Sequence, residues 1–151
     1  HYQIPDYQAD VCVAFAQGNI GKAVQLATSD SFNEIKNSAL HLLKNVSKME
    51  INDIIATVKS VSEFKIDIQD YLDFLAVWYR DILYFKATRD SNGLIFKDEL
   101  NVITDQINKS SYEGIENILR GLQTAKTRLN ANVNFDLTME LLFLLIKENL
   151  V

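Results

Sequence analysis

Few side chains in this sequence could do acid–base or nucleophilic chemistry, and they do not form a catalytic pattern. His41 lies among Leu40, Leu42 and Leu43, and Cys12 lies between two valines. A histidine or cysteine in such apolar surroundings is far more often a packing residue than a base or a nucleophile. No histidine or cysteine partner stands at metal-binding spacing from either of them. The sequence therefore predicts no catalytic residue, no metal site and no cofactor.

Four carboxylates form the one further group that could do chemistry. Glu63, Asp67, Asp70 and Asp73 are close enough in the sequence to gather near one end of a helix, and paired acids can act as general acid and base. Asp70 and Asp73, however, fall on the polar flank of that helix, where solvated carboxylates are common. The Trp78–Asp81 stretch (WYRD) is similarly interpreted as core residues with a surface ion pair. No phosphate-binding loop and no hydrolase or zinc-protease motif is present.

Composition and charge indicate which classes of protein this sequence can belong to. A chain of 151 residues is long enough for one domain, with room for a fragment of a second. A net charge of −5 gives no overall attraction for nucleic-acid phosphates, although a local basic patch stays open. A single cysteine excludes an internal disulfide and fits a reducing compartment. The longest apolar run, residues 137–146, is too short to span a membrane and contains Glu140. With no basic and apolar leader at the start, we expect a cytoplasmic protein.

The stretch from Asp67 to Thr88 is predicted to be the central helix. Its apolar residues recur three and four positions apart over a broad face, and it carries the only tryptophan. Asp67 is predicted to cap its first turn. At about twenty residues such a helix spans roughly 30 Å, the width of a small domain.

The other segments are also predicted to be helical. Pro5 is the single proline, and no alternating run of strand length occurs. Ser110 or Ser111 is predicted to cap the helix over 111–130, and Asn134 or Asp136 is predicted to cap the last helix. The last helix is predicted to pack through Leu137, Leu141, Leu142, Leu144, Leu145 and Leu150. The predicted fold is an all-α bundle of about six helices after two short ones, with helices over 6–17, 20–28, 32–48, 50–61, 67–88, 97–109, 111–130 and from 135 onward.

Three stretches carry a resemblance to a known family. They are AFAQGNIGKAVQLA from Ala14, DFLAVWYRDILYFKAT from Asp73, and LQTAKTRLNANVNFDLTMELLFLLI from Leu122. In this order and at these spacings the chain resembles the C-terminal part of the delta-prime subunit family of bacterial DNA polymerase III, which belongs to the clamp loader. The resemblance covers about residues 6–150, and the order of the motifs is more specific than any one of them.

The resemblance implies two regions and an assembly function. Residues 1–29 would be a remnant of the small lid domain of an AAA+ module, and residues 30–151 a helical collar domain. The collar would hold the clamp-loader pentamer together by contacting the delta and gamma/tau-type subunits during sliding-clamp loading in DNA replication. DNA and the sliding clamp would be reached only through the complex, and no membrane is involved.

Gly21 bears on nucleotide chemistry. ATPase subunits of the clamp loader resemble the Gly18–Gly21 stretch but place an arginine at the start of the second helix, where it reaches the nucleotide's phosphates. Gly21 stands at that position and has no side chain, so no nucleotide-binding site is expected. The two glycines also fit a simple helix break followed by a tight helix start.

Interfaces between subunits favour aromatic and arginine anchors. The interface candidates are Tyr79, Arg80, Tyr84, Phe96, Arg120, Arg128, Asn130, Asn132 and Asn134. Periodicity does not decide which of the aromatic residues face outward, and the asparagines could instead cap the last helix. Three other functions stay open at this point: a helical adaptor unrelated to replication, a nucleotide-binding lid fragment of an AAA+ ATPase, and a DNA binder, which the acidic balance disfavours.

Overall fold

A computed structural model describes residues 30–150 of the chain, apart from the side chains of residues 30, 31, 65 and 66. These residues form six α-helices and no strand. The predicted all-α bundle is thereby confirmed for the described part, whereas the predicted helices over 6–17 and 20–28, with Gly18 and Gly21, lie outside it. The α-helices are α3 (Asp30–Asn45), α4 (Ile51–Val61), α5 (Ile68–Thr88), α6 (Leu100–Lys109), α7 (Tyr112–Asn130) and α8 (Phe135–Glu148), and the short 3-10 helices are η1 (Val46–Lys48), η2 (Ser62–Asp67), η3 (Ser91–Gly93) and η4 (Lys97–Glu99).

Side-chain caps fix the starts of the last two helices, as the sequence predicts. The Ser111 hydroxyl accepts a hydrogen bond from the Gly114 amide at 2.9 Å, and Asn134 Oδ1 accepts one from the Leu137 amide at 2.9 Å. Each bond pairs an amide that has no partner inside its helix. These caps explain why α7 and α8 begin at the residues where they do.

The predicted cap at the start of α5 is wrong. The Asp67 side chain makes no capping hydrogen bond, although α5 begins directly after it. The chain enters α5 from the 3-10 helix η2 rather than from an extended segment. A 3-10 turn that leads directly into an α-helix can supply acceptors for the first amides of that helix.

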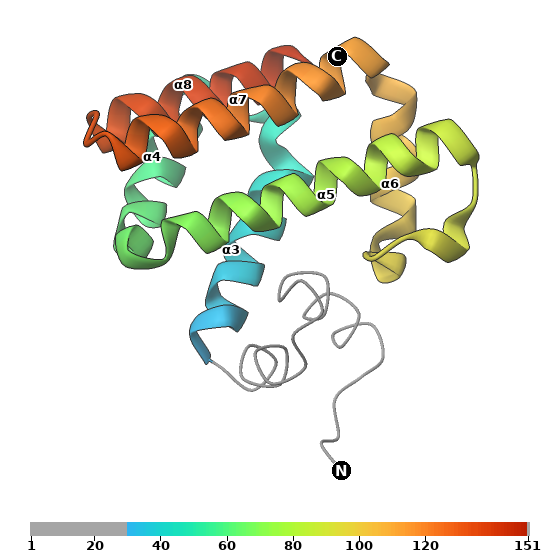
Figure 1. Cartoon of the computed structure of the whole chain (residues 1–151), viewed down its shortest axis with the longest axis horizontal. Coiled ribbons are helices and arrows are strands. Elements are labelled where there is room, and N and C mark those ends of the chain that lie inside the picture. Colours follow the sequence, from blue (N-terminus) through green and yellow to red (C-terminus); the bar gives the residue numbers. More distant parts are fainter. Residues whose placement is uncertain (1–29, 151) are drawn as a thin grey trace.

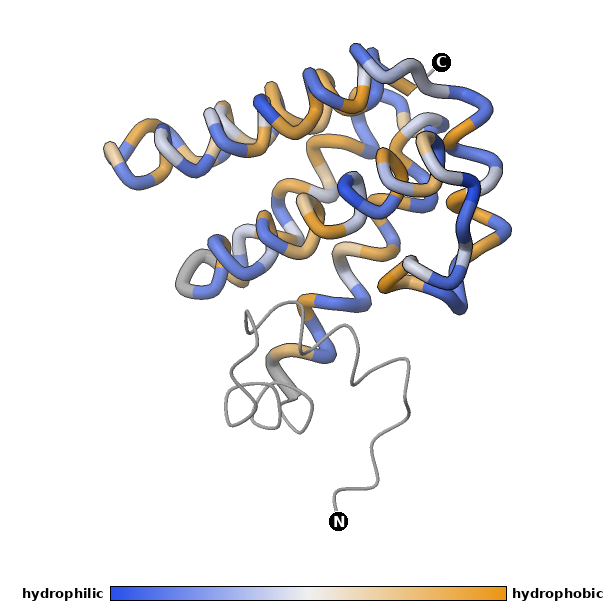
Figure 2. Tube along the Cα trace, turned by 45° about the vertical axis from the view of Figure 1, so that its right-hand side comes forward, coloured by the Kyte–Doolittle hydropathy of each residue, from blue (hydrophilic) through white to orange (hydrophobic). Residues whose placement is uncertain are grey.

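Helix α5 lies at the centre of the molecule. Figure 1 shows it crossing the bundle, with the α7–α8 hairpin on one side and α3 on the other. It contacts α3, α6 and α7. Along the trace in Figure 2, hydrophobic and hydrophilic residues alternate within each helix. The buried residues of α5 are Ile68, Tyr71, Leu72, Phe74, Leu75, Trp78, Tyr79, Asp81 and Ile82. This burial confirms the prediction that residues 67–88 supply the core helix.

Aromatic rings connect α5 to the elements on either side of it. The Phe74 ring centroid lies 6.4 Å from that of Phe32 in α3 and 5.1 Å from that of Phe96. The Trp78 ring lies 5.3 Å from the same Phe96 ring, again in a tilted arrangement. Tilted pairs at these distances are favourable for aromatic rings. The segment before η4 is therefore held in the core by Phe96.

Gln106 joins three helices through hydrogen bonds inside the core. Its Oε1 accepts a bond from Trp78 Nε1 at 3.1 Å, and its Nε2 donates to the Leu43 carbonyl at 2.8 Å. Gln106 is itself only 8% exposed. It thus satisfies the indole N–H of α5 and a carbonyl of α3 at once, which allows both groups to be buried.

Asp81 is buried and does not form the surface ion pair predicted for the WYRD stretch. It is 5% exposed, and its Oδ2 accepts hydrogen bonds from the amides of Ile95 at 2.9 Å and Phe96 at 2.8 Å. Arg80, the residue beside it, is exposed. The carboxylate therefore fixes the segment after η3 against α5. Burial raises the pKa of Asp81, and the two amide bonds oppose that change.

Gln106→Ala is expected to lower the free energy of unfolding by about 2–5 kcal/mol, because it leaves a buried indole N–H and a buried carbonyl without partners. Urea denaturation followed by Trp78 fluorescence measures this loss. Gln123→Ala is the control, since Gln123 is exposed on α7 and its substitution should change the stability by less than about 0.5 kcal/mol. Equal effects of the two substitutions would contradict the bridging role of Gln106.

Asp81→Asn tests the buried carboxylate through pH. The folded chain keeps a proton on Asp81 to higher pH than the unfolded chain, because burial raises the pKa above its ordinary value of 3.8. The stabilisation from this group is complete below that pH and is lost as the pH rises through the folded-state pKa. We expect the unfolding free energy of Asp81→Asn, minus that of the original chain, to increase over this window. Urea titrations at stepped pH measure the difference, and a constant or falling difference would disprove the assignment.

Candidate interaction surface

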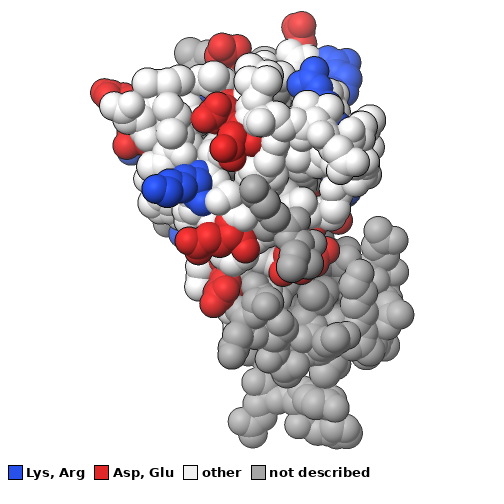
Figure 3. Space-filling model, turned by 90° about the vertical axis from the view of Figure 1, so that its left-hand side faces the viewer, with Lys and Arg blue, Asp and Glu red and all other residues white. Residues whose placement is uncertain are grey.

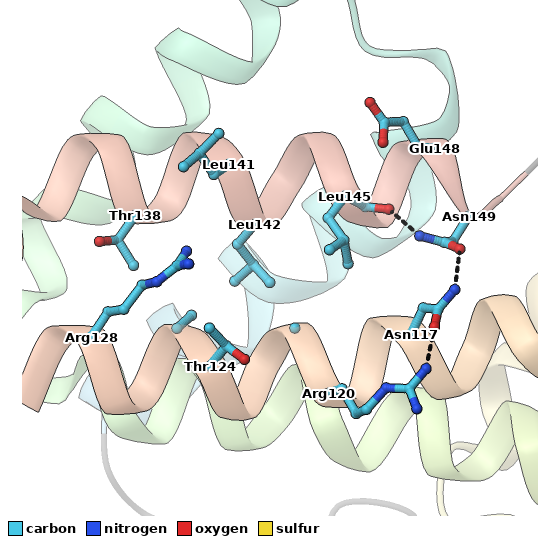
Figure 4. Close-up of a pocket in the computed structure, with 12 residues that line it drawn as sticks. Asn117, Arg120, Thr124, Arg128, Thr138, Leu141, Leu142, Leu145, Glu148 and Asn149 are labelled. Carbon is cyan, nitrogen blue, oxygen red and sulfur yellow. Dashed lines mark hydrogen bonds between the residues drawn. The ribbon is translucent and has the colours of Figure 1, made fainter.

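A groove lies between α7 and α8 on the described surface. The two helices run antiparallel as a hairpin, and the groove has a volume of about 480 Å³. Figure 4 shows side chains entering it from both helices. From α7 it is lined by Asn117, Arg120, Gly121, Thr124, Ala125 and Arg128, and from α8 and the residue after it by Thr138, Leu141, Leu142, Leu145, Glu148 and Asn149. These α7 residues recur three or four positions apart, which places them along one face of the helix.

Gly121 leaves room on α7 for a leucine side chain of α8. A Cβ atom at this position would lie 2.8 Å from Cδ2 of Leu145, so the end of that side chain would have to shift. The absence of a side chain thus lets Leu145 lie against the backbone of α7. A glycine inside a helix costs about 1 kcal/mol in helix propensity relative to alanine.

The two arginines of the groove differ in their partners. Arg120 donates a hydrogen bond to Asn117 Oδ1, Asn117 Nδ2 donates to Asn149 Oδ1 at 3.3 Å, and Asn149 Nδ2 donates to the Leu145 carbonyl at 2.8 Å (Figure 4). This chain of bonds orients Arg120 at one end of the groove. The side chain of Arg128, two turns away, makes no hydrogen bond or ion pair with the described residues, so its charge is available to a partner.

The outer side of α8 is apolar and open to solvent. Leu137 is 52% exposed and Leu141 is 47% exposed, so the prediction that these two leucines pack in the core is wrong. The residues that bury α8 are instead Thr138, Met139, Leu142, Phe143 and Ile146, which lie on the opposite face of the helix. Two large exposed leucines one turn apart are a feature of protein-binding surfaces.

Tyr79 and Phe96 are not interface residues. Both are 0% exposed, so the structure contradicts the interface prediction for these two candidates. Tyr79 lies on the inner face of α5, and Phe96 packs between the rings of Phe74 and Trp78. Neither side chain can reach another protein while the core is intact.

The other aromatic candidate is accessible. Tyr84 is 39% exposed, and its hydroxyl lies 3.4 Å from Asp90 Oδ2. Arg80 is exposed on the same helix, α5. Both residues are therefore on the surface, but neither lines the groove between α7 and α8.

The three asparagine candidates lie at one end of the hairpin and serve its local structure. Asn130 ends α7, and its Oδ1 accepts a bond from Gln69 Nε2 at 3.3 Å. Asn132 has a φ of 60°, a left-handed conformation that asparagine tolerates better than most residues. Asn134 caps α8. The capping alternative considered for the asparagines is thus observed for Asn134.

One of the four carboxylates near the start of α5 forms an ion pair. Asp73 pairs with Lys126 across α5 and α7, and no group of three or more possible metal ligands occurs among residues 30–150 with described side chains. His41 is exposed.

No helix of the described chain is long and apolar enough to cross a membrane. On the face shown in Figure 3, basic side chains lie apart from one another with acidic ones between them, so this face offers no continuous basic patch.

Sequence reasoning missed the exposed leucines and the groove beside them. The signal that could have found them is the apolar content of α8, whose leucines and other large side chains extend over more than one face. A helix that contacts the bundle on one side has no room inside for all of them. The surplus must face solvent or a partner.

Comparison with known proteins gives two matches. A family model described as "DNA polymerase III, delta subunit, C terminal" matches residues 39–148. The chain is 26% identical over 133 residues to the DNA polymerase III subunit delta' of Bacillus subtilis (strain 168), a match that covers 86% of this chain. The chain spans about 40% of the length of that relative. No solved structure gives a significant match.

Tyr79→Phe is expected to leave the stability unchanged or raise it by up to about 1 kcal/mol, because the Tyr79 hydroxyl is buried without a hydrogen-bond partner in the described structure. Its burial also raises the pKa of Tyr79, so the group stays neutral and loses no charge interaction on substitution. Thermal and urea unfolding measure the change, with Tyr84→Phe on the surface as the control. A loss above about 1 kcal/mol would show that the hydroxyl does have a partner.

Proposed function

The chain belongs to the family of C-terminal domains of the DNA polymerase III delta subunit, and on this premise we propose that it is an assembly domain of a clamp loader. In this function residues 30–151 form the collar, which holds the loader together while other parts of the complex act on DNA and the sliding clamp. The single observation that carries the proposal is the pair of exposed leucines on α8, Leu137 and Leu141, next to Arg128, whose side chain has no partner among the described residues. The described core of residues 30–150 leaves these leucines accessible to another protein.

The partners proposed are the other loader subunits, of the delta and gamma/tau types. Assembly interfaces commonly bury about 1,200–2,000 Å², and a few aromatic and arginine side chains near the centre carry most of the binding energy. The α7–α8 hairpin offers Leu137, Leu141, Arg120 and Arg128 together on adjacent helices. Arg80 and Tyr84 on α5 offer a second, separate place for contact.

Residues 1–29 are proposed to be the remnant of an AAA+ lid domain, and Gly21 in place of an arginine argues that this remnant does not complete a nucleotide site. Because the relative is a polymerase subunit of a bacterium, the bacterial cytoplasm is the proposed location. The family match does not favour an adaptor unrelated to replication, and the net charge of −5 does not favour direct DNA binding.

Size-exclusion chromatography of the 151-residue chain mixed with the delta and gamma/tau-type subunits of the same loader tests the proposal. We expect the chain to elute with them at about 10 μM, since assembly interfaces of standard size reach micromolar affinity or tighter. The chain alone and the subunits alone give the reference elution volumes. Separate elution of all components at this concentration would contradict the assembly function.

A further inference from the structure

We propose that the groove between α7 and α8 binds one acidic amphipathic helix of a neighbouring subunit. In the bound state an apolar side chain of that helix lies against Leu141 and Leu145. Two of its carboxylates, about two helical turns apart, pair with Arg120 and Arg128. The inference rests on the proposed assembly function and adds the chemistry of the partner segment to it.

The apolar part of the proposal follows from the shape and lining of the groove. Its α8 wall presents Leu141, which is 47% exposed, and Leu145, which packs over Gly121 of α7 and stays partly exposed. Leu137, 52% exposed, continues this apolar wall one turn further along α8. A helix laid between two helices buries its apolar stripe against such a wall and its hydrogen-bonded backbone needs no partner. A helical occupant therefore fits better than an extended peptide.

The charged part follows from the placement of the arginines. Arg120 and Arg128 are eight residues apart on one helix, which corresponds to about 12 Å along its axis. Both line the same wall, and no lysine or arginine lines the opposite wall. A second helix has the same rise per residue, so carboxylates seven or eight positions apart on it match this spacing. Guanidinium groups bind carboxylates through two parallel hydrogen bonds, which adds geometric specificity.

Within residues 30–150, no acidic side chain that the structure describes pairs with either arginine. The hydrogen-bond partner of Arg120 is the neutral amide of Asn117, and the side chain of Arg128 has no partner among the described residues. Glu148 is the acidic residue of the lining, and Figure 4 shows its carboxylate pointing away from Arg120. The groove is therefore locally positive on a chain whose net charge is −5. A partner with acidic side chains at this spacing is favoured, and a basic one is repelled.

Charge reversal in the chain gives the first test. Arg128→Glu should raise the dissociation constant for the delta and gamma/tau-type subunits at least about tenfold, because it replaces an attractive charge by a repulsive one. Lys59→Glu makes the same change of charge on the exposed side of α4 and should leave binding within about twofold. The melting temperature of both variants should equal that of the original chain. Unchanged subunit binding by Arg128→Glu would overturn the inference while leaving the assembly function intact.

A designed peptide gives the second test and does not depend on the assembly function. The probe is a helical 18-residue peptide with two glutamates eight positions apart and a leucine midway between them, and its control carries lysines in place of the glutamates. We expect the acidic peptide to bind the 151-residue chain with chemical-shift changes at Leu141, Leu145 and Thr124. The lysine peptide should bind better to the Arg120→Glu, Arg128→Glu double variant than to the original chain.

The outcomes separate the two proposals. If the chain does not assemble with the subunits but binds the acidic peptide in the groove, the assembly function fails and the groove specificity stands. If both peptides bind equally, or if the shift changes lie outside α7 and α8, the inference is wrong. Concentration-dependent dimerisation of the chain alone that Arg128→Glu abolishes would also overturn it, because the occupant would then be a second copy.

Discussion

The structure depends on burying α5 from several sides at once. A helix in this position can be buried only if its polar side chains find partners inside the protein, because an unpaired buried polar group costs about 1–3 kcal/mol. Gln106 meets this requirement for the indole of Trp78, and the amides of Ile95 and Phe96 meet it for Asp81. The same bonds attach α3, α6 and the segment before η4 to α5. The arrangement of half the bundle thus follows from the polar groups of one helix.

The helices themselves could be predicted from the sequence because their causes are local. Apolar spacing in residues 67–88 identifies the buried side of α5, and Ser111 and Asn134 identify the starts of α7 and α8 through bonds that span only three residues. The role of Asp81 could not be predicted in the same way. Its partners lie 14 and 15 positions further along, in a segment without regular structure. Only the tertiary fold brings them together.

The sequence predicts the arginines of the candidate surface but not which aromatic residues belong to it. Arginines are good interface candidates from residue type alone, and Arg120 and Arg128 do line the groove, whereas Tyr79 and Phe96 are aromatic residues of the core. Residue type does not distinguish these cases, since aromatic side chains stabilise cores and interfaces by the same burial. For α8 the deciding fact is which face meets α4 and α7. That choice leaves Leu137 and Leu141 outside.

The exposed leucines and the groove have one structural origin. Gly121 leaves room on α7 for the Leu145 side chain of α8, and Met139, Phe143 and Ile146 then turn toward the interior of the bundle. Because that face of α8 packs in the core, Leu141 lies at the rim of the groove. Replacing it by a polar residue would cost the isolated chain little, because a half-exposed side chain contributes only part of its burial energy. A leucine at this position therefore contributes little to the stability of the fold, which is consistent with the proposed contact in a complex.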